Sequence, residues 1–214
     1  MKLYPLKFKP VFKYRIWGGE KLRQVLNKDC SEQSIGESWE VSGLNGDETM
    51  VKEGPLKGKT LKELIDKYKT DLVGSCCYNR FGNEFPLLIK FIDTAEPLSI
   101  QVHPNDEVAQ NAHNSNGKNE MWYILEADRD AELIVGFKKD TNKSEIQRSI
   151  NEGTLTDFLN IEKVEPGDVL YIPIGTVHAI GKGVTLIEIQ QTSDITYRLY
   201  DYDRVDVQTG LKRE

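Results

Sequence analysis

The chain has 214 residues, of which 38% are hydrophobic and 29% charged, a composition that predicts one soluble globular domain. The formal net charge of −6 argues against a general nucleic-acid binder, because such a protein needs a basic surface to displace counterions. No apolar run is long enough to span a membrane, and the first residues lack a signal-peptide core. The three cysteines form no disulfide framework. We therefore expect a cytoplasmic protein that binds neither nucleic acid nor membrane.

The N-terminal half predicts a strand and one clear helix. Residues 36–43 alternate side-chain character as a strand does. Thr60 followed by Glu63 has the capping-box pattern, and apolar residues then recur at helical spacing. We therefore expect a helix near 60–73, ended by Gly74.

Strands dominate the second half of the chain. The expected strands are short apolar segments bounded by turn residues, at 86–94, 98–104, 120–127, 131–137, 168–175, 184–191 and 196–202. A helical region near 144–159 interrupts them, with Ser144 and Gln147 as its expected cap. This pattern predicts a mainly β antiparallel sandwich or barrel with a few added helices, in a single domain over 1–214.

Several of these strands carry side chains that bind metals. Residues two apart on a strand share a face, so Gln101 and His103 point the same way. Glu120 opens another strand, and a Pro-x-Gly turn is expected to direct His178 into the barrel. One amide, one carboxylate and two imidazoles suit Zn²⁺, with Fe²⁺, Mn²⁺ and Co²⁺ as competitors. The third histidine, His113, is expected to be a surface residue in a polar loop.

Residues 167–178, with the pattern Gly-x5-Pro-x-Gly-x2-His, resemble the second sequence motif of the cupin superfamily. Within that superfamily the chain resembles type I mannose-6-phosphate isomerases, also called phosphomannose isomerases, in their compact bacterial form. The matching stretches cover nearly the whole chain, at 16–19 (IWGG), 36–42 (GESWEVS), 85–104, 117–125 (GKNEMWYIL), 166–181 and 188–204. The resemblance implies a cupin barrel, a double-stranded β-helix or jelly roll, with a metal inside.

The resemblance also implies a reaction and the residues that carry it. A zinc-dependent aldose-ketose isomerase would interconvert mannose 6-phosphate and fructose 6-phosphate, moving a proton between C1 and C2 through an enediol. One Zn²⁺ per chain would be bound by Gln101, His103, Glu120 and His178. The residues implicated in catalysis are Arg198, Asp194 and Lys118.

Three further residues are expected to contact the substrate. Glu188 matches a substrate-facing glutamate of the family, although it could also only support neighbouring strands. Ser99 shares the face of the metal ligands and either binds phosphate or packs. Trp17, beside two glycines, either joins the core or forms a pocket wall. The proton carrier is Glu188, Asp194 or a metal-bound water.

The relatives usually continue into a second, C-terminal β-domain, which this chain is expected to lack. The alternatives to an active isomerase are therefore an inactive fragment, a non-catalytic cupin that binds a sugar or sugar phosphate, and a cupin oxygenase. Oxygenases favour two histidines and one carboxylate. The additional Gln101 and the basic residues favour the isomerase, as a monomer or a homodimer.

Overall fold

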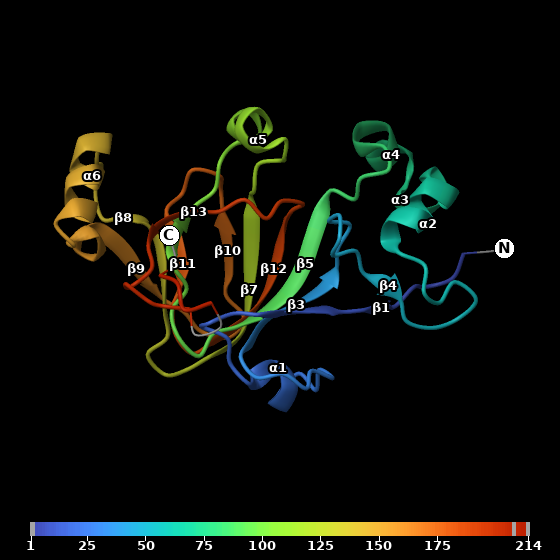
Figure 1. The fold of residues 1–214 in the computed structure, drawn as a ribbon, viewed down its shortest axis with the longest axis horizontal. Coiled ribbons are helices and arrows are strands. Elements are labelled where there is room, and N and C mark those ends of the chain that lie inside the picture. The colour runs from blue at the N-terminus through green and yellow to red at the C-terminus, as the bar shows by residue number, and fades with distance from the viewer. Residues whose placement is uncertain (1–2, 207–208, 213–214) are drawn as a thin grey trace.

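The computed structural model describes residues 3–206 and 209–212, and antiparallel strands form its framework (Figure 1). The strands are β1 (Phe8–Lys9), β2 (Val11–Tyr14), β3 (Ile35–Val41), β4 (Met50–Val51), β5 (Leu87–Asp93), β6 (Ile100–Val102), β7 (Glu120–Ala127), β8 (Glu132–Phe137), β9 (Leu159–Lys163), β10 (Val169–Ile172), β11 (His178–Ile180), β12 (Val184–Gln191) and β13 (Tyr197–Tyr200). The helices are α1 (Lys21–Gln24), α2 (Leu61–Tyr68), α3 (Thr70–Val73), α4 (Ser75–Phe81), α5 (Asp106–His113), α6 (Lys143–Asn151) and the 3-10 helix η1 (Leu155–Phe158).

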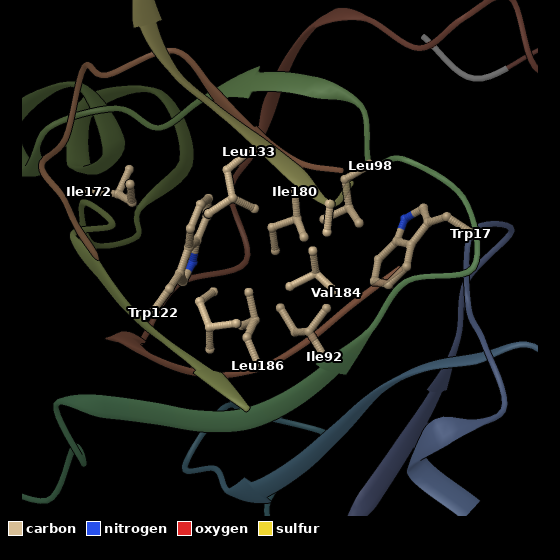
Figure 2. Close-up of a cluster of buried hydrophobic side chains, with 11 residues drawn as sticks. Trp17, Ile92, Leu98, Trp122, Leu133, Ile172, Ile180, Val184 and Leu186 are labelled. Carbon is tan, nitrogen blue, oxygen red and sulfur yellow. The ribbon is translucent and has the colours of Figure 1, made fainter. Parts of the chain in front are cut away.

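Two antiparallel sheets pack face to face to form the barrel. One has the strand order β10-β7-β12-β5-β3-β2 and the other β13-β6-β11-β8-β9, while β1 and β4 form a separate pair. Figure 2 shows the apolar core between the sheets. Ile92, Trp122 and Leu186 of the larger sheet meet Leu133 and Ile180 of the smaller one there. The mainly β barrel predicted from the sequence is confirmed.

The helices lie at the periphery of the barrel (Figure 1). The predicted capping box of α2 is confirmed, because the Thr60 hydroxyl accepts from the Glu63 backbone and the Glu63 carboxylate accepts from the Thr60 backbone. A helix also ends before Gly74, as expected, but α4 follows at once. None of the described helices is both long and apolar enough to cross a bilayer.

Three local predictions were wrong. The capping box of α6 is formed by Asn142 and Glu145, two residues before the expected pair Ser144 and Gln147. His113 does not lie in a loop but ends α5, where its Nε2 is 2.7 Å from the Tyr197 hydroxyl. The single helix expected near 60–73 is divided at Lys69, whose backbone φ is 48°, into α2 and α3. The helical region expected near 144–159 is confirmed as α6 and η1.

Candidate metal centre and adjoining cavity

The metal-binding side chains are brought together by the pairing of β6 with β11 and β13. Gln101 on β6 lies opposite His178 on β11 and opposite Arg198 on β13. Directly opposed residues of an antiparallel pair point to the same face with their Cβ atoms about 5 Å apart. Glu120 enters the same interior from the first position of β7, in the other sheet.

His103, Glu120 and His178 form a buried cluster at this point. Their ligand atoms lie within 4.8 Å of one another, and each residue is at most 2% exposed. His103 Nε2 is 3.2 Å from one Glu120 oxygen, and His178 Nε2 is 3.5 Å from the other. Two ligands bound tetrahedrally to a zinc ion at 2.0–2.2 Å would lie about 3.4 Å apart. The spacing therefore matches a shared divalent cation.

The hydrogen bonds behind the two imidazoles indicate which nitrogens face the cluster. His103 Nδ1 lies 3.0 Å from the Ile195 carbonyl, and His178 Nδ1 lies 2.9 Å from the Thr176 carbonyl. A carbonyl only accepts, so each Nδ1 donates its proton and each Nε2 faces the Glu120 carboxylate. His103 Nε2 and both Glu120 oxygens are buried and have no hydrogen bond of good geometry. These buried atoms without hydrogen-bond partners fit a bound cation.

Gln101 completes the predicted set of four. Its amide Nε2 lies 3.3 Å from His178 Nε2, and its Oε1 accepts from the Ser99 hydroxyl at 3.4 Å. Rotating the amide by 180° would direct the oxygen at the cluster and leave the nitrogen beside Ser99. The structure thus brings Gln101, His103, Glu120 and His178 to one place, as the alternation of strand residues predicts.

Charge and burial set the protonation of this cluster. Burial alone would raise the pKa of Glu120, but the Lys118 ammonium, 3.0 Å from Oε1, and the imidazoles hold it well below its usual range. Burial also lowers the pKa of His178 to about 4, although the nearby Glu120 charge opposes that shift. The cluster is therefore an ionised carboxylate with a neutral His178, as metal binding requires.

We expect the metal-free chain to lose stability as the pH falls from about 6.5 to about 4. His178 has a folded pKa of about 4 against an ordinary value of 6.5, so the unfolded chain binds more protons in this window and stability rises with pH. At about 1.4 kcal/mol per pKa unit, the contribution reaches roughly 3 kcal/mol. Urea unfolding at several pH values measures it, and His178→Gln should flatten the slope. An equal slope in that variant would contradict the assignment.

A cavity of about 360 Å³ adjoins the metal cluster. Its lining includes the other six predicted site residues: Trp17, Ser99, Lys118, Glu188, Asp194 and Arg198. Gln101 also lines it, and Lys118 spans from the cavity to Glu120. Asp194 and Arg198 are exposed, whereas Lys118 and Glu188 are buried. Trp17 belongs to both the core and the cavity wall.

Two buried charges of this cavity were missed by the sequence analysis. Lys90 on β5 is 5% exposed and lies 2.9 Å from Glu188 and 3.9 Å from Glu37. Glu37 on β3 also pairs bidentately with Arg15 and accepts from the Trp39 indole. Burial would raise the pKa of Glu37, yet Lys90 and Arg15 lower it to about 2. The feature of the sequence that could have indicated this buried charge was Lys90, a single lysine within a mostly apolar strand.

Glu188 is fixed in the cavity from two sides. One carboxylate oxygen pairs with Lys90, and the other accepts a 2.8 Å hydrogen bond from the Trp122 indole. Burial would lower the pKa of Lys90, but the charges of Glu188 and Glu37 raise it above its ordinary value. The lysine therefore stays charged and stabilises the Glu188 carboxylate.

Comparison with known proteins places this arrangement among sugar-phosphate isomerases. Residues 5–142 match the family model described as phosphomannose isomerase type I, catalytic domain. Mannose-6-phosphate isomerase ManA of Bacillus subtilis is 45% identical over 213 residues, covering 99% of this chain and 65% of that protein. The mannose-6-phosphate isomerase of Streptococcus mutans is 40% identical, covering 98% of this chain and 64% of the relative.

A solved structure agrees with the sequence relatives. The crystal structure of the mannose 6-phosphate isomerase from Bacillus subtilis superposes with a TM-score of 0.90 at 40% identity, over 99% of this chain and 66% of that chain. The present chain thus spans about two thirds of the length of these proteins. Within that span the barrel is the same.

Proposed function

The chain belongs to the type I phosphomannose isomerase family, and on that premise we propose that residues 1–214 form the cupin-type catalytic domain of a zinc-dependent isomerase of mannose 6-phosphate and fructose 6-phosphate. The observation that carries the proposal is the convergence of four metal donors beside a cavity with buried lysines and a rim arginine. The three free cysteines agree with a cytoplasmic location. We propose a monomer or a homodimer, which analytical ultracentrifugation distinguishes.

The donor set supports zinc as the metal. Gln101, His103, Glu120 and His178 would hold one Zn²⁺ per chain, because two imidazoles with oxygen donors suit this ion. When bound, the metal would supply Lewis-acid stabilisation of an oxyanion. The neutral state of His178 and the ionised state of Glu120 leave the donors ready to bind.

The chain's own residues would bind the sugar phosphate and stabilise the charge that develops on it. Proton transfer between C2 and C1 places negative charge on the carbonyl oxygen, which fixed cations in a water-poor pocket stabilise. Lys118 is a buried ammonium at the inner end of the cavity, and Arg198 supplies a guanidinium at its rim. Arg198 would stabilise the enediolate or, with Ser99, hold the phosphate.

The proton carrier must reach the C–H bond, and two carboxylates of the cavity are candidates for this role. Glu188 and Asp194 both line the cavity, and their surroundings differ. Glu188 is 3% exposed and anchored by Lys90 and Trp122, whereas Asp194 lies in water at the rim. We propose Glu188 or Asp194 for this role, with Trp17 limiting access of water to the sugar.

One assay separates this proposal from its alternatives. The purified chain is incubated with mannose 6-phosphate, and fructose 6-phosphate is followed before and after treatment with a chelator. We expect conversion that the chelator abolishes and that added Zn²⁺ restores. Binding of the sugar phosphate without conversion would instead indicate a non-catalytic cupin or an inactive fragment, and restoration by Fe²⁺ alone would argue against zinc.

A further inference from the structure

The amide of Asn119 contacts two segments that lead to the metal cluster. Asn119 itself directly precedes Glu120 in the chain. Its Nδ2 donates to Gln191 Oε1 at 2.6 Å, and its Oδ1 accepts from the Ile174 backbone and from the Tyr171 hydroxyl, each at 3.1 Å. One half-buried side chain thus joins the start of β7, the end of β12 and the turn between β10 and β11.

Asn119 and Gln191 are joined by two further hydrogen bonds. The Gln191 side-chain oxygen also accepts from the Asn119 backbone at 2.9 Å, and the Gln191 backbone donates to the Asn119 carbonyl at 3.1 Å. The chain then turns through residues 191–195, where the Gln190 amide donates to the Ser193 carbonyl at 2.7 Å. This turn ends at Ile195, whose carbonyl orients His103.

The contact with Ile174 bears on the imidazole of His178. Ile174 lies in the turn that ends at Thr176, whose carbonyl orients His178. That turn is closed by a 3.1 Å hydrogen bond from Thr176 to the Pro173 carbonyl. One of the two carbonyls that orient the histidine rings lies four residues after Gln191, and the other lies two residues after Ile174. Asn119, the residue beside Glu120, is hydrogen-bonded to both Gln191 and Ile174.

We infer that Asn119 is a positioning residue for the metal centre, an inference that rests on the metal site proposed above. It does not touch the ion. It holds Glu120, the Ile195 carbonyl behind His103 and the Thr176 carbonyl behind His178 in one arrangement. Groups that orient metal ligands typically change metal affinity by about 10–100-fold when removed. Backbone carbonyls cannot be mutated away, so the side chain that locates them is the place to test this.

The test measures Zn²⁺ affinity of the purified chain by competition with a chromogenic chelator, beside thermal unfolding of the metal-free form. For Asn119→Ala we expect the zinc dissociation constant to rise about tenfold or more. Asn160→Ala is the matched control, because Asn160 is also half-buried and makes two side-chain hydrogen bonds, but on the edge strand β9. It should unfold at a lower temperature yet keep the wild-type zinc dissociation constant.

A second variant covers the case in which Asn119→Ala does not fold. Gln191→Met leaves Asn119 in place but removes the oxygen that accepts from both its side-chain amide and its backbone N–H, and it should shift the zinc dissociation constant in the same direction. An unchanged constant in a folded Asn119→Ala, or in Gln191→Met if only that variant folds, overturns the inference alone. A wild-type chain that binds no Zn²⁺ overturns the proposed function and this inference with it.

Discussion

Glu120→Gln is expected to remove stoichiometric zinc and to lower isomerase turnover by about 10³-fold or more. Glu120 is the only carboxylate of the buried cluster, and a neutral amide cannot offset the charge of a divalent cation. Metal ions supply several kcal/mol of charge stabilisation, and about 1.4 kcal/mol corresponds to tenfold in rate. Metal analysis of the purified variant and the coupled isomerase assay measure the two effects.

The same substitution is expected to destabilise the metal-free chain. Lys118 is buried with its ammonium 3.0 Å from Glu120, so the variant would leave that charge without an anion at this position. Removing one partner of a buried ion pair typically costs about 3–5 kcal/mol. The lowered pKa of Glu120 agrees with this, because it indicates that the metal-free site favours the anion.

Glu126→Gln provides the control for both effects. Glu126 lies on the same strand β7 but does not line the cavity. Its substitution should leave zinc content, turnover and stability close to wild type. If Glu120→Gln retained one zinc per chain and normal turnover, the metal centre assigned here would be wrong.

The convergence of the four proposed ligands could be predicted because their signals are local. Strand alternation places Gln101 and His103 on one face, and the Pro-x-Gly turn precedes His178 within a few residues. The buried network around Lys90 depends instead on which strands become neighbours. Lys90 lies opposite Glu188 only because β5 pairs with β12 in one particular register, which a single sequence does not specify.

The start of α6 was misplaced because two residues could cap it. Asn142 and Ser144 are both competent N-caps, and each is followed three residues later by a suitable partner. The earlier start agrees with the hydrogen bonds of Glu145, which accepts from the Asn142 backbone, the Asn142 amide and the Thr141 hydroxyl. Helix α5 was missed because only Ala109 among its residues is buried, so the segment has little apolar periodicity.

Arg198→Ala is expected to lower turnover by about 10²–10³-fold while zinc remains bound at one per chain. Arg198 lies opposite Gln101 on the neighbouring strand and lines the cavity at its rim, and it is not one of the four proposed ligands. Loss of one group that stabilises developing negative charge typically costs this much in kcat. Zinc content is measured on the same preparation, so that loss of metal is not mistaken for loss of a catalytic group.

The kinetic constants of Arg198→Ala also separate the two roles open to this guanidinium. A fall in kcat with an unchanged KM would indicate contact with the enediolate, whereas a rise in KM alone would indicate binding of the phosphate in the ground state. Arg198→Lys should restore part of the activity, because it returns the charge but not the planar fork of donors. Arg129→Ala, in the exposed turn between β7 and β8, controls for the loss of one positive charge. If Arg198→Ala with full zinc turned over like the wild type, Arg198 would have no catalytic role, and charge stabilisation would fall to Lys118 and the metal.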